Sequence, residues 1–227
     1  HDSSSACDIP ARRIAVVLNG IDAEIFQPQP DIPREPFHLI TTASADQPLK
    51  GTQHLIPAVA ELAQRYPDLK LTFIGAPKIG GKTETLIHSL GLSDRIEFHH
   101  GLSFEDIVRL YARASVAVVP SEYEGFGVPA GEAMACEVPL VSTDGGALPE
   151  VVGDAGMIVP SKNPKALADA IAYLFDHPEA RARLSRAGRQ RIVDRFSWAR
   201  AAGEFTQHYH QVIVLEFPIQ SKYQKYP

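Results

Sequence analysis

Short apolar runs that favour β-strands alternate with amphipathic helical segments along this chain, and this alternation limits its fold more than any other feature. Strands joined by helices form right-handed crossover units, which lay the strands parallel in one sheet. The sequence therefore predicts an α/β fold with a doubly wound, mostly parallel sheet. The expected strands cover residues 14–18, 37–42, 69–74, 96–99, 116–119, 138–142 and 157–159. The expected helices cover residues 51–66, 82–90, 104–112, 163–175, 179–196 and 198–214, and a further helix begins near Pro129.

The clearest local pattern is a strand, a glycine-rich turn and a helix start in immediate succession. Residues 116–119 form an unbroken apolar run, which is typical of a strand buried on both faces. Gly125 and Gly127 flank Phe126 in the turn, and the fixed φ of Pro129 suits the first helical position. Such a turn presents free backbone N–H groups at the positive end of a helix. It therefore predicts an anion site, usually for phosphate.

Two carboxylates, Glu124 and Glu132, bracket this turn with seven residues between them. A dinucleotide-binding fingerprint is one alternative, with Asp144 as the ribose-binding acid, but its first glycine should follow the first strand of a sheet directly. A purely structural turn with two solvated carboxylates is the other alternative. That interpretation leaves an exposed Phe126 between two glycines unexplained.

The motif Ser121-x-x-Glu124-Gly125-Phe126-Gly127, followed by Glu132-Ala133-Met134-Ala135, resembles a known signature. It is similar to the Glu-x7-Glu motif of retaining glycosyltransferases of the GT-B fold, family four type, also called glycosyl transferases group 1. The resemblance implies a Rossmann-like C-terminal half of a GT-B fold, the half that binds the donor. It implies that Glu124 is catalytic and contacts the donor sugar, and that Glu132 binds the ribose hydroxyls. The implied diphosphate contacts come from the backbone of Gly125, Phe126, Gly127 and Val128.

Two other loops carry residues that the resemblance places near the donor. Lys50 matches a lysine that clamps the diphosphate in the family. The family has an arginine five positions earlier, where this chain has Ala45, and the neighbouring Asp46 adds an opposing charge. We therefore assign a hydroxyl donor to Ser44 in place of the arginine. The contacts to the nucleotide base are assigned to Gly101, Leu102 and Ser103.

Other motifs in the sequence give weaker signals. The segment Gly75–Thr83 nearly matches a phosphate-binding P-loop, but Ala76 stands where the first glycine is required, so we interpret it as a flexible loop. His99 and His100 point to opposite faces of a strand, and no Cys/His cluster has ligand spacing. The sequence thus predicts no metal site and no cofactor.

Composition excludes several classes of function. The net charge of −5 argues against a nucleic-acid surface, and no apolar run approaches the ~20 residues that span a bilayer. The two cysteines, Cys7 and Cys136, make no disulfide framework. We therefore expect a cytoplasmic protein, with peripheral contact to a membrane only through a missing half.

The expected organisation is a lead-in over residues 1–12, a nucleotide-sugar-binding domain over 13–215 and a loose tail over 216–227. Because enzymes of the GT-B fold carry an acceptor-binding half first, we expect that N-terminal domain to be the missing partner. Phe205, Tyr209 and Val212 form an apolar stripe on the last helix, which is expected to contact that partner or a second copy.

The resemblance implies transfer of a sugar from a nucleoside diphosphate sugar, of the UDP, GDP or ADP type, to a hydroxyl acceptor with retained configuration. We expect the intact protein to be a hexosyltransferase and the isolated chain to be inactive. Two alternatives stay open at this point. One is an epimerase or phosphorylase on the same fold, and the other is a non-catalytic nucleotide-binding module.

Overall fold

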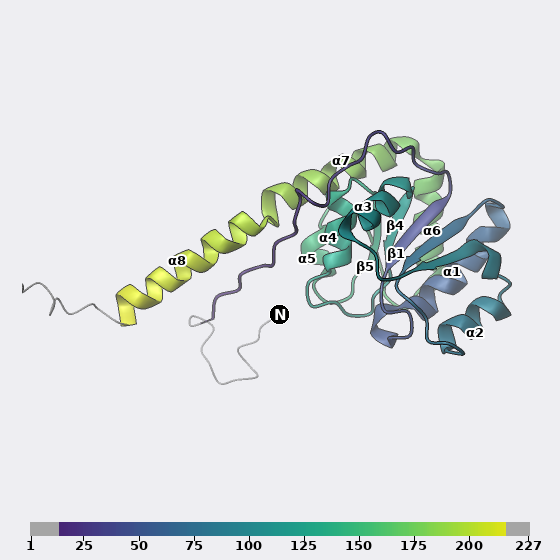
Figure 1. Ribbon diagram of the computed structural model, residues 1–227, viewed down its shortest axis with the longest axis horizontal. Coiled ribbons are helices and arrows are strands. Elements are labelled where there is room, and N and C mark those ends of the chain that lie inside the picture. The colour runs from purple at the N-terminus through teal and green to yellow at the C-terminus, as the bar shows by residue number, and fades with distance from the viewer. Residues whose placement is uncertain (1–13, 217–227) are drawn as a thin grey trace, which may run out of the picture.

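The computed structural model describes residues 14–216 and contains a six-stranded sheet between two layers of helices (Figure 1). All five strand pairs are parallel, and the strand order is β3-β2-β1-β4-β5-β6. The prediction of a doubly wound parallel α/β sheet is therefore confirmed. The strands are β1 (His38–Thr42), β2 (Lys70–Ile74), β3 (Ile96–His99), β4 (Val116–Val119), β5 (Leu140–Thr143) and β6 (Met157–Val159).

The helices occupy both faces of this sheet and bury two separate cores. The α-helices are α1 (Thr52–Arg65), α2 (Lys82–Ser89), α3 (Phe104–Arg113), α4 (Val128–Ala135), α5 (Leu148–Val152), α6 (Pro164–Asp176), α7 (Pro178–Arg195) and α8 (Trp198–Glu216). Two short 3₁₀ turns are η3 (Pro48–Lys50) and η4 (Ser93–Arg95). Apolar residues of α1, α2 and α6 fill one core, and those of α3, α4 and α5 fill the other.

Alternation along each strand divides the side chains between these cores. In β1, Leu39 belongs to the core under α1, whereas Ile40 belongs to the core under α4. In β4, Val118 and Val119 are divided in the same way. Successive side chains of a strand point to opposite faces, so a strand covered on both sides must be apolar throughout. All four residues of β4 are buried for this reason.

The prediction of a strand over residues 14–18 was wrong. This segment has no strand partner, and the side chain of Val16 is 73% exposed. It runs beside the junction of α7 and α8, where Ile21 donates its backbone N–H to the carbonyl of Phe196 over 2.6 Å. A strand is stabilised by its neighbour's hydrogen bonds, and both edges of the sheet lie elsewhere. Most other predicted bounds lie within two residues of the observed ones.

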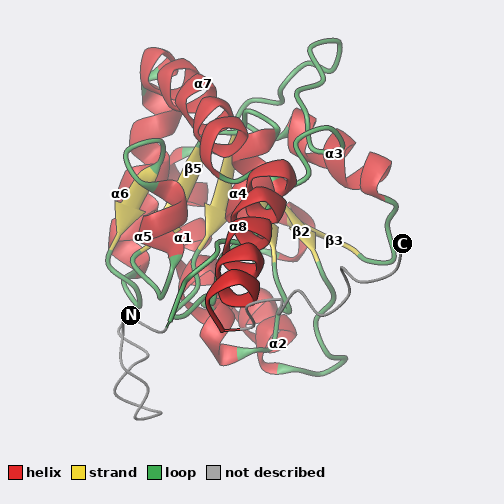
Figure 2. Cartoon of the chain, turned by 90° about the vertical axis from the view of Figure 1, so that its left-hand side faces the viewer, coloured by secondary structure: helices red, strands yellow, loops and turns green. Residues whose placement is uncertain are grey.

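The last helix extends away from the body of the domain, as Figure 1 shows. Figure 2 is turned so that α8 points toward the viewer. The predicted stripe of Phe205, Tyr209 and Val212 is exposed, and the rings of Phe205 and Tyr209 stack with centroids 6.3 Å apart. No helix in the described part of the chain is both long and apolar enough to cross a membrane. The lead-in over 1–12 and the tail beyond residue 216 lie outside the described residues.

Candidate functional site

The candidate site lies at the carboxyl ends of β1 and β4, which are neighbours in the sheet. The chain winds outward from β1 to β3 on one side and from β4 to β6 on the other. The loops that leave β1 and β4 therefore diverge at this point. In open parallel sheets this position forms a crevice that binds ligands.

An ion pair joins the two loops at the centre of this site. Lys50 Nζ lies 2.7 Å from Glu124 Oε1, and Ser121 Oγ donates to the same oxygen over 2.8 Å. The side chain of Glu124 is only 10% exposed, and that of Lys50 is 27% exposed. Within residues 14–216, Glu124 Oε2 accepts no hydrogen bond. One carboxylate oxygen is thus held by the protein, and the other is available to a ligand.

Gly51 allows Lys50 to approach Glu124. Its φ of +70° lies in the left-handed region, and a methyl group there would overlap the carbonyl oxygen of Pro120. Only glycine fits both conditions, because it has no Cβ. The turn that carries Lys50 therefore packs directly on the end of β4.

The glycine-rich turn ends in the N-terminus of α4, as predicted. Gly127 has a φ of +95° and caps the helix, which begins at Val128 rather than at Pro129. Within the described residues, the backbone N–H groups of four consecutive residues donate no hydrogen bond: Gly125, Phe126, Gly127 and Val128. These groups, together with the helix dipole, can bind an anion. A Cβ at Gly125 would meet open space, so the turn is accessible from outside.

The loop after β5 packs against the backbone of the glycine-rich turn and binds it through a hydrogen bond. The Ala147 N–H donates to the backbone carbonyl of Glu124 over 2.9 Å. Gly146 has a φ of +62° and approaches the Glu124 backbone so closely that a Cβ could not fit. The Gly145-Gly146 pair therefore fixes the backbone from which the Glu124 side chain projects.

Glu132 lies on the second turn of α4, half-buried beside Tyr111 of α3. The Tyr111 hydroxyl lies 3.4 Å from Glu132 Oε2 and 3.1 Å from Thr42 Oγ1. Burial raises the pKa of Glu132 to about 7, and the hydrogen bond from Tyr111 opposes this rise only in part. A carboxylate with too few donors for its burial gains most from a ligand that brings hydroxyl groups.

Phe126 is not exposed, in contrast to the prediction. Its ring packs against Phe196 with centroids 5.8 Å apart and an interplanar angle of 62°. It also contacts the core under α4. The residue is an apolar anchor for the turn, and its backbone N–H has no hydrogen-bond acceptor among the described residues.

The loop after β1 differs from what the family pattern predicts. Ala45 is 3% exposed and belongs to the core under α1, so an arginine there would not reach the site without rearrangement. The Asp46 carboxylate is turned away from Lys50 and accepts the N–H groups of Lys78 and Thr83 over 2.6 and 3.1 Å. Its charge therefore stabilises the loop after β2. Ser44, the predicted hydroxyl donor, is exposed two residues beyond the end of β1.

The loop after β3 carries the residues assigned to the base. Gly101 has a φ of +66° with open space around it, and Leu102 is half-buried against the core under α4. Ser103 caps α3, because its Oγ accepts the Asp106 N–H over 3.2 Å. A local capping role explains this hydroxyl. The three residues share the carboxyl edge of the sheet with Glu124 but make no hydrogen bond to it among the described residues.

Sequence reasoning missed Glu122. Its carboxylate is bound by Gln53 and His54 of α1 and by Lys162 of the loop between β6 and α6. No motif points to it, because its partners lie far apart in the sequence.

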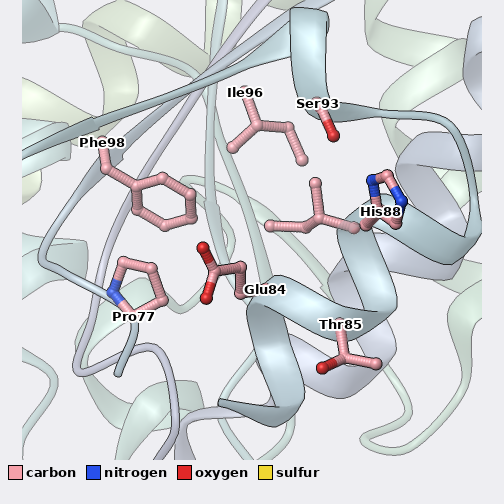
Figure 3. A pocket seen from close by; sticks show the side chains of 8 residues that line it. Pro77, Glu84, Thr85, His88, Ser93, Ile96 and Phe98 are labelled. Carbon is pink, nitrogen blue, oxygen red and sulfur yellow. The ribbon is translucent and has the colours of Figure 1, made fainter. Parts of the chain in front are cut away.

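A separate pocket of about 520 Å³ opens between α2 and β3 (Figure 3). Glu84 and His88 of α2 line it together with Phe98 of β3. None of its lining residues belongs to the candidate site. Within residues 14–216, no group of three or more His, Cys, Asp or Glu side chains could hold a metal ion.

Comparison with known proteins gives a consistent result. A sequence model of the family described as "Glycosyl transferases group 1" matches residues 23–191. MMP alpha-(1->4)-mannosyltransferase of Mycolicibacterium hassiacum is 40% identical over 220 residues, which cover 93% of this chain and 53% of the relative. D-inositol 3-phosphate glycosyltransferase of Corynebacterium glutamicum is 35% identical over 227 residues, which cover 92% and 54%. The chain spans about half the length of the curated relatives it matches.

Solved structures share the fold. The C-terminal domain of a glycosyl transferase group 1 family protein from Francisella tularensis is 26% identical, with a TM-score of 0.68 over 79% of this chain and 100% of that one. Anabaena HepE in complex with UDP and glucose is 21% identical, with a TM-score of 0.80 over 89% of this chain and 58% of that one. The predicted Rossmann-like C-terminal half of a GT-B fold is therefore confirmed.

Proposed function

Because the chain belongs to the family of glycosyl transferases group 1, we propose that it is the donor-binding domain of a retaining glycosyltransferase. The donor is a nucleoside diphosphate sugar, and the acceptor carries a hydroxyl group. The observation that carries this proposal is the Lys50–Glu124 pair, which lies beside a turn of unbonded N–H groups at the start of α4.

The diphosphate binds between Lys50 and the glycine-rich turn. The ammonium group and the N–H groups of Gly125 to Val128 supply positive charge without a metal ion. During transfer the bond from the sugar to the diphosphate breaks, and negative charge grows on the leaving phosphate oxygen. Preorganised donors at that oxygen stabilise the transition state more than the bound donor.

Glu124 binds the donor sugar through its free oxygen. Since Oε1 already accepts from Lys50 and Ser121, Oε2 is the atom that accepts from a sugar hydroxyl. This contact orients the ring relative to the diphosphate. The fixed backbone of the turn makes the orientation specific, because the Glu124 side chain has little freedom.

Glu132 binds the ribose. It projects from the same helix whose start holds the diphosphate, burial raises its pKa to about 7, and the Tyr111 hydroxyl is its one side-chain donor among the described residues. Two ribose hydroxyls would supply further donors and favour the ionised form. The M. hassiacum relative is named a mannosyltransferase, so mannose is the first donor sugar to test.

Transfer requires a second domain, because the chain spans about half the length of the curated relatives it matches. The crevice at the carboxyl edge has one wall here, and a second wall would exclude water and place the acceptor. The exposed stripe of Phe205, Tyr209 and Val212 on α8 is the surface that we assign to the partner domain. The chain alone therefore binds donor but does not transfer sugar.

A ligand screen by thermal shift tests this proposal. UDP, GDP and ADP, each free and linked to mannose or glucose, are added to the chain, and one base series should raise the melting temperature. The chain is then assayed for transfer alone and with the upstream half of the protein in trans. Transfer only in the presence of the upstream half supports the proposal. The absence of any nucleotide effect contradicts it, and turnover by the chain alone contradicts the two-domain requirement.

A further inference from the structure

The Glu122 carboxylate, in the loop after β4, binds the start of α1 and the loop between β6 and α6 at the carboxyl edge of the sheet. Its Oε1 accepts from Gln53 Nε2 and from His54 Nε2, each over 2.9 Å. Its Oε2 accepts from Lys162 Nζ over 3.0 Å. Because a carboxylate can only accept, His54 Nε2 must carry a proton in this arrangement. The donors come from α1 and from the loop between β6 and α6.

The same residue is tied to the turn that ends in Lys50. The Glu122 N–H donates to the carbonyl of Leu49 over 2.8 Å. Gln53 Nε2, which donates to Glu122, also donates to the carbonyl of Pro48 over 2.8 Å. Glu122 therefore holds the η3 turn in two ways. Its own N–H binds the turn directly, and its carboxylate binds the Gln53 side chain, which in turn binds the Pro48 carbonyl.

This arrangement differs from an ordinary surface ion pair. The Glu122 side chain is 15% exposed, whereas the exposed fractions in the Arg109–Glu105 pair of α3 are 59% and 75%. The hydrogen bonds from His54 and Lys162 lower the pKa of Glu122, so the carboxylate is ionised at neutral pH. Exposed pairs contribute little, but a shielded carboxylate with three donors fixes the groups around it.

We propose that Glu122 is a positioning residue that holds the η3 turn so that Lys50 meets Glu124 and the diphosphate. It does not touch the donor itself. The inference rests on the proposed function, because its readout is binding of the diphosphate.

A double-mutant cycle between Glu122 and Lys50 tests this inference by calorimetry. The variants are Glu122→Ala, Lys50→Met and the pair, and the ligands are UDP and GDP with uridine and guanosine as nucleoside controls. Glu122→Ala should weaken binding of the diphosphate by about tenfold, because the displaced Lys50 loses its charge-assisted contact with the diphosphate. In the Lys50→Met background the same change should cost less than about twofold. Affinity for the nucleoside should not change.

Two further variants keep the test decisive. Lys162→Met removes one donor to Glu122 and changes only an exposed side chain, so this variant should fold even if Glu122→Ala does not. It should weaken diphosphate binding less than Glu122→Ala does. This loss should also disappear in the Lys50→Met background. Glu105→Ala removes a carboxylate from the exposed surface of α3 and should leave binding unchanged.

The outcomes separate the inference from its premise. The positioning role is overturned if the losses of affinity from Glu122→Ala and Lys50→Met add fully in the double variant. It is also overturned if Glu122→Ala weakens binding of the diphosphate and of the nucleoside equally. In both cases the proposed function stands. Failure of the unsubstituted chain to bind any nucleotide contradicts the proposed function, and with it the inference.

Discussion

Lys50 Nζ lies 2.7 Å from Glu124 Oε1, although the two residues are 74 positions apart in the sequence. The pair connects the group that we assign to the diphosphate with the group that we assign to the sugar. A phosphate oxygen that binds Lys50 must compete with Glu124 for the ammonium group. The two subsites are therefore coupled by one charge.

Glu124→Gln should separate the two subsites. Without its anionic partner, Lys50 is free to bind phosphate, so affinity for UDP or GDP should stay the same or rise by about two- to fivefold. The additional affinity conferred by the linked sugar should fall, since the side chain loses its charge. Calorimetry with the free and sugar-linked nucleotides measures both effects, and Glu150→Gln on the exposed surface of α5 is the matched control. A tenfold weaker affinity for the free nucleotide would contradict the competition.

Gly51→Ala should displace Lys50 and destabilise the chain. Gly51 and Gly80 have similar φ values, +70° and +66°, but only Gly51 faces backbone that a methyl group would overlap. Gly80→Ala should thus cost about 1 kcal/mol from backbone strain, and Gly51→Ala about 1–3 kcal/mol more. Urea unfolding gives both free energies. Equal losses in the two variants would show that the close approach to Pro120 does not constrain the turn.

The strand-and-helix skeleton was predictable because its signal is local. Residues 116–119 are apolar without interruption, and the observed strand β4 has those bounds. The glycine-rich turn and the helix start were also predictable, since glycine and proline act on their own backbone. The segment 14–18 looks like a strand by the same criterion, but no neighbouring strand accepts it.

The connections inside the site were not predictable from the sequence. Glu122 draws its donors from α1 and from Lys162, and no local pattern identifies such partners. From the sequence, Ala45 was interpreted as the replacement of an arginine in the site and Asp46 as an opposing charge beside it. In the structure, Ala45 is a core residue, and Asp46 accepts the N–H groups of Lys78 and Thr83. These roles depend on which loops meet in three dimensions.

Binding of the donor should depend on the ionisation of Glu132. Its pKa in the free chain is about 7, and ribose hydroxyls favour the ionised form, so binding releases a proton below that pH. Affinity for a nucleotide sugar should therefore fall by about tenfold between pH 8 and pH 6. A nucleotide sugar is the suitable probe, because it lacks a terminal phosphate with a pKa near 6. Glu132→Gln should remove the slope, and a flat profile for the unsubstituted chain would contradict the assignment.

His38 in β1 should contribute less stability as the pH drops below about 6.5, whereas Glu132, whose pKa is raised to about 7, contributes in the opposite direction over the same range. Burial lowers the pKa of His38, although Glu35 Oε2 lies 3.2 Å from its Nδ1 and opposes the shift. The folded chain therefore favours the neutral ring, and this contribution is complete above the unfolded pKa. It is lost progressively as the pH falls from that value toward the folded one.

Urea unfolding at several pH values measures this effect. The His38 contribution should decrease by up to ~1.4 kcal/mol per pH unit in this window, so the slope of the unfolding free energy against pH should differ between the unsubstituted chain and His38→Gln by up to that amount. Replacement of the exposed His100 by Gln is the control. The lowered pKa values of Glu35 and Glu122 act only below about pH 4.5, where their stabilising charge is lost. Identical slopes with and without His38 would rule out its role.

The most direct test of the account is the affinity of the chain for UDP, GDP and ADP, compared with that of Glu132→Ala. Loss of a charged acceptor for two hydroxyls costs about 1.5–3 kcal/mol, so the variant should bind the preferred nucleotide at least about tenfold more weakly. Glu105→Ala, on the exposed surface of α3, should bind like the unsubstituted chain. A tenfold loss confined to Glu132→Ala would place the ribose on α4 and the diphosphate at its N-terminus. Unchanged affinity in Glu132→Ala would remove Glu132 from the site, and failure of the unsubstituted chain to bind any of the three nucleotides would contradict the proposed donor-binding function.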